Sequence, residues 1–212
     1  MSQNKQSLRW DYFLLVEADF IETHKYVHPS IYNSKTYSLK YWQILQCICS
    51  EIDSTLKDIC REISPDMGAS ISGRNWKISD SYDLIRNKDK TTTRKCRTEW
   101  DKKFQDIWSL QIFPSNETWN NIQPWQAWSS QNYDKEMSIP IWWNSYNLIK
   151  HNRNDATIKE ATLENVIYAF CALIALLIDL DFSTIKKGPI FVPSNFFVVP
   201  GFPHNLVGGG SF

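Results

Sequence analysis

Apolar residues recur at helical spacing along several stretches of this chain. The clearest stretch covers residues 37–63, where apolar positions are separated by alternating steps of three and four residues: Trp42, Leu45, Cys49, Ile52, Leu56, Ile59 and Ile63. Such a stripe predicts a long helix that packs at a shallow angle against nearly antiparallel neighbours. Thr36 is expected to cap its N-terminus, and the helix should end before Ser64-Pro65.

Two further amphipathic helices are predicted, one before and one well after this long helix. The first runs from about residue 10 to residue 27 and is ended by Pro29. Its apolar stripe consists of Phe13, Val16, Phe20 and Val27, with His24 on the same side. The other covers residues 140–153 and begins at Pro140, whose fixed φ suits a first helical turn.

A fourth helix is predicted at residues 163–181, with Thr162 as its N-cap. The run from Val166 to Ile178 holds thirteen consecutive apolar residues before Asp179 interrupts it. A membrane span needs about 18 or more, so a membrane segment is the weaker interpretation. Because the apolar residues surround this helix on every side, the pattern is typical of a central helix in a bundle.

The remaining segments are less regular. Residues 66–100 resemble a loop with one short element at most, and a short helix is expected near residues 100–110. The Trp-rich connection up to residue 128 could stack on bases, but packing against the bundle is the commoner fate of such rings. The sequence therefore predicts one mainly α domain over residues 1–185, an antiparallel bundle of four to five helices with an irregular Trp-rich insertion. Residues 186–212 should form a short extended tail, either a small β-hairpin or a strand lying against the bundle.

Composition narrows the range of functions only a little. The 212 residues contain 23 Lys and Arg against 23 Asp and Glu, so no global charge points to nucleic acid or membrane. A local exception is Arg86–Lys103, which contains eight basic residues. Such a run is usually a solvated surface, although it would provide an electrostatic footprint for RNA if it folded beside the 140–153 helix.

The cysteines favour a reducing compartment. They are five in number and follow no disulfide framework: Cys47, Cys49, Cys60, Cys96 and Cys171. They are expected to be small buried residues, and no spacing of Cys with His supports a zinc site. The N-terminal residues lack the apolar run of a secretory signal, so a cytoplasmic location is expected. No glycine-rich phosphate loop is found, and no cofactor is expected.

The helix predicted at 140–153 carries the candidate chemistry. On a helical wheel one side collects Ile141, Trp142, Ser145, Leu148 and Ile149, and the opposite side collects Trp143, Asn147, Lys150, His151 and Asn154. Tyr146 and Arg153 flank the polar side. A histidine one turn after an asparagine, with Lys150 and Arg153 close by, could hold a phosphate and move a proton. In the plainer interpretation the histidine is simply solvated and the cations complement the helix dipole.

Trp143 adds an expectation about assembly. A tryptophan on the polar side of an amphipathic helix needs cover, which a second subunit would supply. We therefore expect a homodimer with this helix near its twofold axis.

These residues also carry a family resemblance. The stretch Tyr146–His151, followed by Arg153 and the apolar helix after it, resembles the HEPN superfamily of small helical bundles. The upstream segment 26–57 is similar to that of uncharacterised bacterial HEPN-like proteins with a YN-x-x-KH-x-R motif. The family signature is an arginine, often a polar residue next, and a histidine four to six positions after the arginine. Asn147 matches the polar position and His151 the histidine, whereas Tyr146 occupies the arginine's place.

The resemblance, which extends over about residues 10–182, implies a prokaryotic antiviral defence, abortive-infection or toxin–antitoxin setting. Many HEPN proteins are metal-independent endoribonucleases that dimerise and pool two motifs at the interface. On that pattern His151 would transfer the proton, and Lys150 or Arg153 would supply the missing cation. Asn147 would orient the phosphate, with Tyr146, Trp143 and Asn154 as substrate-binding residues.

Two classes of function stay open at this point. One is a dimeric RNA-linked or partner-binding module with a degenerate motif, whose partner would be RNA or a cognate defence or antitoxin protein. The other is an active metal-independent endoribonuclease that uses His151 with Lys150 or Arg153. The change at Tyr146 favours the first class, since a fold does not transmit its function without the residues of the site.

Overall fold

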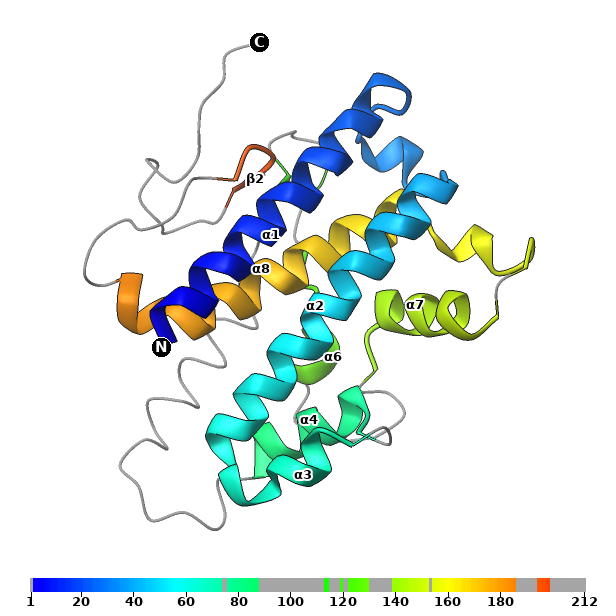
Figure 1. Cartoon of the computed structure of the whole chain (residues 1–212). Coiled ribbons are helices and arrows are strands. Elements are labelled where there is room, and N and C mark those ends of the chain that lie inside the picture. The colour runs from blue at the N-terminus through cyan, green and yellow to red at the C-terminus, as the bar shows by residue number, and fades with distance from the viewer. Residues whose placement is uncertain are drawn as a thin grey trace.

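The computed structural model describes residues 2–73, 76–87, 113–114, 119, 122–129, 139–152, 154–185 and 194–198. Within these ranges the chain is mainly helical, which confirms the predicted class (Figure 1). The helices are α1 (Ser2–Glu22), α2 (Leu39–Ile63), α3 (Gly68–Ile71), α4 (Ile78–Asn87), α6 (Gln126–Ser129), α7 (Ile141–His151) and α8 (Leu163–Ile185). Two short strands, β1 (Phe113–Pro114) and β2 (Phe197–Val198), complete the architecture.

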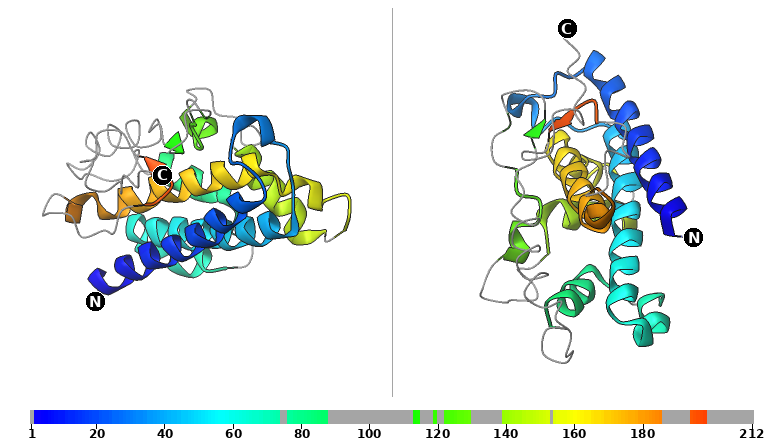
Figure 2. Two further views of the ribbon diagram at one scale, coloured as in Figure 1. Left: turned by 90° about the horizontal axis from the view of Figure 1, so that it is seen from above. Right: turned by 90° about the vertical axis from the view of Figure 1, so that its left-hand side faces the viewer.

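Helix α8 lies at the centre of the molecule. Helices α1 and α2 lie on one side of it, and α6 lies on the other (Figure 2). The described side chains from Phe170 to Leu177 are all buried, as the apolar run predicts. The hydroxyl of Thr162 accepts a hydrogen bond from the Asn165 N–H at 3.2 Å, which confirms the predicted N-cap.

Helix α2 is the second organising element, and it contacts α1, α4, α7 and α8. Its predicted stripe is buried from Leu45 through Ile59. Its N-cap differs from the prediction, because Ser38 and not Thr36 accepts the hydrogen bond from the Tyr41 N–H, at 3.0 Å. Thr36 is occupied elsewhere: its carbonyl accepts from the Leu163 N–H at 2.8 Å and so fixes the start of α8.

The segment after α2 is more regular than the sequence suggested. Helices α3 and α4 stand where a loop with at most one short element was expected. Ile78 and Tyr82, one helical turn apart, are buried against the bundle. The four-residue spacing of these two side chains was the signal for α4. The helix expected near residues 100–110 and most of the basic run 86–103 lie outside the described residues.

Three tryptophans fix the irregular segments to the bundle. The indole N–H of Trp119 donates to the Pro29 carbonyl at 2.8 Å, and that of Trp125 donates to the Ala172 carbonyl of α8 at 3.1 Å. The ring of Trp128 packs against that of Trp125, with 4.5 Å between the centroids and the planes tilted by 50°. These rings are buried, so they pack against the bundle and offer no surface for base stacking.

The described residues of the C-terminal tail, Ser194–Val198, lie against the bundle. Its strand β2 pairs antiparallel with β1, with Phe113 opposite Val198 and Pro114 opposite Phe197. The strand partner of the described tail is thus the irregular middle segment and not a second part of the tail. Of the two forms expected, the described tail residues take the strand lying against the bundle.

Candidate functional site

Helix α7 turns a different face to the core from the one its helical wheel suggested. Its buried residues are Trp142, Trp143, Ser145, Tyr146 and Ile149. Ile141 and Leu148, which were assigned to the apolar side, are 80% and 46% exposed. The helix rests against both α2 and α8, and a helix seated between two neighbours buries a wider arc than one apolar stripe.

The prediction that Trp143 lies on an open polar face is therefore wrong. Trp143 is only 6% exposed, and its ring packs edge-on against Trp142 at 5.8 Å and against Tyr146 at 5.1 Å between centroids. The cover that this tryptophan needs comes from its own chain. The structural argument for a homodimer through Trp143 no longer holds, and Trp143 cannot meet a substrate at the surface.

Tyr146, at the position of the family arginine, is also buried, with 5% of its surface exposed. Burial, together with the nearby Cys49 and Asp53, raises the pKa of its hydroxyl to about 12, so the side chain stays neutral. The ammonium of Lys150 lies 5.3 Å from the centre of its ring, close enough for a cation–π contact. The ring of Tyr146 thus packs beneath the ammonium of Lys150. Tyr146 is not exposed at the surface, where the arginine of the family motif would contact a phosphate.

Three of the predicted catalytic residues come together at the end of α7. Lys150 and His151 are exposed and Asn147 is half-buried, and we call these three residues the α7 edge. In the described part of the chain, neither Asn147 nor His151 forms a side-chain hydrogen bond or ion pair. The α7 edge therefore offers an amide, an ammonium and an imidazole to an outside ligand. Arg153, the fourth predicted member, lies outside the described residues.

Asn154 has a structural role. Its side-chain oxygen accepts hydrogen bonds from the Ala156 and Thr157 N–H groups, each at 3.0 Å, and so closes the turn after α7. Ser145 donates to the Glu160 carboxylate at 3.0 Å and links α7 to the same connection. Asn154 was predicted to bind substrate, and in the structure its side-chain oxygen holds this turn.

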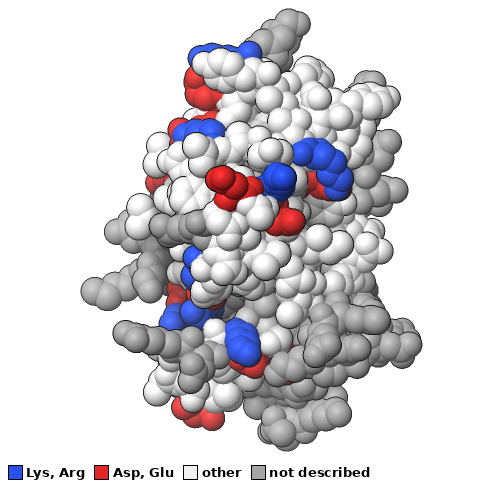
Figure 3. Space-filling model, turned by 90° about the vertical axis from the view of Figure 1, so that its right-hand side faces the viewer, with Lys and Arg blue, Asp and Glu red and all other residues white. Residues whose placement is uncertain are grey.

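The surroundings of the α7 edge carry mixed charge. On the side of the molecule where α7 lies, the described Lys and Arg side chains are interspersed with Asp and Glu and form no continuous basic patch (Figure 3). Asp53 of α2, which is near Tyr146, pairs with Lys57 at 2.7 Å. Any anion bound at this edge must be held by a few local contacts.

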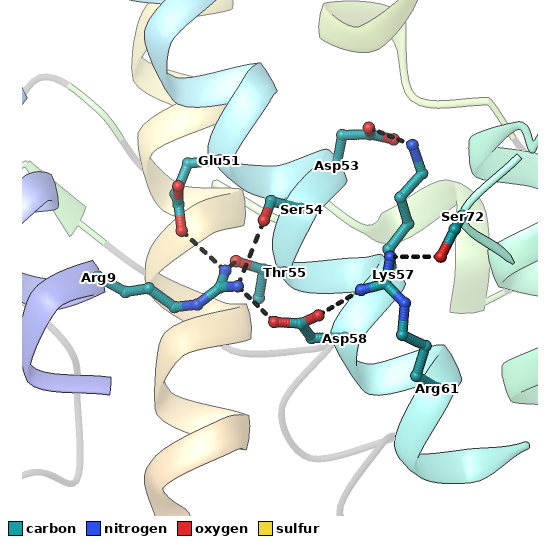
Figure 4. A network of polar contacts seen from close by, with 9 residues as sticks. All are labelled: Arg9, Glu51, Asp53, Ser54, Thr55, Lys57, Asp58, Arg61 and Ser72. Carbon is teal, nitrogen blue, oxygen red and sulfur yellow. Dashed lines mark hydrogen bonds and ion pairs between the residues drawn. The ribbon is translucent and has the colours of Figure 1, made fainter. Parts of the chain in front are cut away.

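A polar cluster that sequence reasoning missed joins α1 to α2 (Figure 4). The Arg9 guanidinium donates to the Glu51 carboxylate and to the Asp58 carboxylate, both at 2.7 Å, and also bonds Thr55 and Ser54. Arg61 pairs with the other oxygen of Asp58. Because these groups satisfy one another, the cluster is a clamp between two helices and not a ligand site.

Comparison of the chain with protein-family models, with curated proteins and with solved structures gives no match. In the ranges that the structure describes, no helix is both long and apolar enough to cross a membrane. No group of three or more His, Cys, Asp or Glu side chains in those ranges is placed to hold a metal ion.

Proposed function

We propose that this chain is an HEPN-like helical module of a prokaryotic defence or toxin-type system, which binds RNA through the α7 edge without cleaving it. The observation that carries the proposal is the burial of Tyr146 beside an exposed Lys150 and His151. An RNA-cleaving site of this family would need a cation at that position. Tyr146 places a neutral, buried phenol there. The α7 edge therefore keeps groups that can bind RNA but lacks the cation at the family's arginine position. The defence setting rests on the family resemblance alone.

The α7 edge suits a small number of phosphate contacts. The Lys150 ammonium can pair with a phosphate oxygen, and the His151 ring N–H and the Asn147 amide can each donate a hydrogen bond to another. The C-terminal end of a helix carries partial negative charge, which opposes an anion there. Binding should therefore be weak and should depend on these side chains individually.

The second candidate is a metal-independent endoribonuclease, and one observation favours it. Lys150 and His151 are adjacent and exposed, so a cation and a proton-transfer group are available together. Histidine is the usual side chain for that transfer near neutral pH. This candidate requires cleavage in EDTA and loss of cleavage in His151→Ala.

Binding of a fluorescent single-stranded RNA, measured across a salt series, tests the first candidate. One cationic contact, from Lys150, predicts a slope of about −0.7 in a plot of log affinity against log salt, with a dissociation constant on the order of 10⁻⁴ M. Lys150→Ala should bring the slope close to zero, because the cationic contact is removed. Lys25→Ala, an exposed lysine paired with Glu22 on another part of the surface, should change nothing.

The same samples separate the two candidates when the RNA is run on a gel. Intact RNA with measurable binding supports the non-cleaving module, and cleavage that depends on His151 supports the nuclease. Absence of binding by the folded protein would overturn the RNA proposal and leave contact with a partner protein as the role of the α7 edge. Tyr146→Arg, which restores the family pattern, should mainly destabilise the fold, since it places a guanidinium at a buried position.

We also propose that two copies meet through the outward face of α7, with Ile141 and Leu148 in the role first given to Trp143. These two exposed apolar side chains are seven residues apart and so share one helical face. Leu148→Glu should convert a dimer into a monomer, because like charges would meet across the twofold axis. Light scattering coupled to gel filtration measures this. A monomeric wild-type protein would contradict the proposal.

A further inference from the structure

The described part of the C-terminal tail packs against a surface formed by α1 and α8. We call residues Ser194–Val198 the tail segment, and we call the surface beneath it, formed by Phe13, Glu17, Phe20 and His24 with Phe170 of α8, the tail groove. The ring of Phe196 lies 5.3 Å from that of Phe20 and 4.9 Å from that of His24, and the ring of Phe197 lies 5.2 Å from that of Phe170. Both tail phenylalanines are buried.

The floor of this groove contains a buried carboxylate. Glu17 is 0% exposed, although it lies on the otherwise apolar face of α1. Its oxygens accept hydrogen bonds from the Asn195 N–H at 3.0 Å, from the Phe196 N–H at 3.2 Å and from the Ser194 hydroxyl. In the described part of the chain, every side-chain hydrogen bond to Glu17 comes from the tail segment. A buried carboxylate without donors is costly, so the groove is incomplete without a segment of this kind.

The contacts define what the groove selects. Ser194, Phe196 and Phe197 are buried, whereas the Asn195 side chain is exposed and contributes only its backbone N–H. The Ser194 hydroxyl also accepts a hydrogen bond from the Phe197 N–H at 2.8 Å. This bond closes a turn in which both phenylalanine rings face the tail groove. The pattern that is read is therefore Ser-x-Phe-Phe, with any residue at x. Phe197 and Val198 form β2 and add a strand to β1, a common way of binding peptides.

We propose that the tail groove is a peptide-recognition site for Ser-x-Phe-Phe segments, and that the chain's own tail occupies it as a replaceable ligand. The partner is a protein that carries this pattern in an extended segment and displaces the tail. The resident tail is attached through residues 186–193, between the last residue of α8 and Ser194. It is held by one carboxylate, two rings and a two-residue strand, which is a small set of contacts that can open while the bundle stays folded.

Hydrogen exchange on the wild-type protein tests whether the tail opens by itself. The amides of Asn195 and Phe196, which donate to Glu17, should exchange at least about 100-fold faster than the amide of Ile174 in the middle of α8. That result means local release of the tail. Equal protection of these amides would mean that the tail leaves only when the whole protein unfolds, and would overturn the proposal.

Binding of a labelled peptide with the sequence of residues 192–199, VPSNFFVV, tests recognition directly. The full-length variant Phe196→Ala/Phe197→Ala vacates the groove and should bind this peptide at least about 10-fold more tightly than wild type, whose resident tail competes at a millimolar effective concentration. Adding Glu17→Gln to that variant should weaken binding about 10-fold or more, since the donors lose a charged acceptor.

Peptide variants supply the matched controls. A peptide with the Asn195→Ala change should bind as well as the parent, and one with the Phe197→Ala change should not bind. Circular dichroism establishes that each protein variant is folded. If the double variant does not fold, Ser194→Ala, which keeps both rings but removes one donor, replaces it and should also bind the peptide more tightly than wild type. Equal affinity for all peptides, or no binding to a folded vacated groove, would overturn the proposal.

Discussion

A glutamate in place of Trp143 should unfold this protein and not merely separate two subunits. The substitution removes a large buried ring, which typically costs about 3–5 kcal/mol, and places a carboxylate among Trp142 and Tyr146 without a partner. A loss of this size approaches the whole stability of a typical domain. Urea denaturation followed by circular dichroism measures it, and little or no folded protein should remain at 25 °C.

The matched control lies two residues earlier on the same helix. Ile141→Glu changes an apolar residue to the same acid at a position that is 80% exposed in the single chain. It should separate the proposed dimer, but each protomer should stay folded, with its stability changed by no more than about 0.5 kcal/mol. A folded Trp143→Glu protein with unchanged denaturation would mean that the ring is not buried. That outcome would return Trp143 to its predicted place at a subunit interface.

The face of α7 shows where sequence reasoning reaches its limit. A helical wheel gives the angles between side chains, but it does not say how many neighbouring helices the helix will contact. Because α7 contacts both α2 and α8, Trp143 and Tyr146 are buried along with Trp142 and Ile149. The aromatic residues of α7 therefore occupy its buried face, and the aliphatic Ile141 is exposed in the single chain.

Other elements were predictable because their signals are local. Thr162 caps α8 and the uninterrupted apolar run after it makes a helix with no polar side, so its central position followed. The start of α2 was placed two residues early, because Thr36 and Ser38 are both good caps and only the contact of Thr36 with α8 decides between them.

The polar anchors of the fold could not be predicted in this way. Glu17 interrupts an apolar stripe, and nothing near it in the sequence explains a carboxylate at that position. Its hydrogen-bond donors come from residues 194–196, near the other end of the chain. Arg9 finds its partners on α2, 42 to 49 residues later. No periodicity joins positions so far apart, and a single sequence contains no record of their pairing.

Arg9→Ala should cost the protein about 2–3 kcal/mol at pH 7. The Arg9 side chain is 13% exposed and is shared by Glu51 and Asp58, so its removal leaves the partly buried Glu51 without its cation and Asp58 with Arg61 alone. Breaking a fully buried pair costs about 3–5 kcal/mol, and the partial exposure here lowers that figure. Lys57→Ala, which breaks an i,i+4 pair with Asp53 on the same helix, should cost about 0.5 kcal/mol or less. The free energy of unfolding in urea measures both.

The pH dependence of the Arg9→Ala variant tests the cause of that loss. Burial raises the pKa of Glu51, and the Arg9 charge opposes this rise. Without Arg9 the pKa of Glu51 should rise further. A carboxyl group whose pKa is raised by folding favours the folded state at low pH, and this contribution is lost as the pH rises through that pKa. The deficit of Arg9→Ala should therefore shrink between pH 7 and pH 5, and Glu51→Gln in the same background should reduce the deficit at pH 7. A deficit that is the same at both pH values would mean that Arg9 stabilises the fold by packing its aliphatic stem, and not by neutralising the carboxylates of α2.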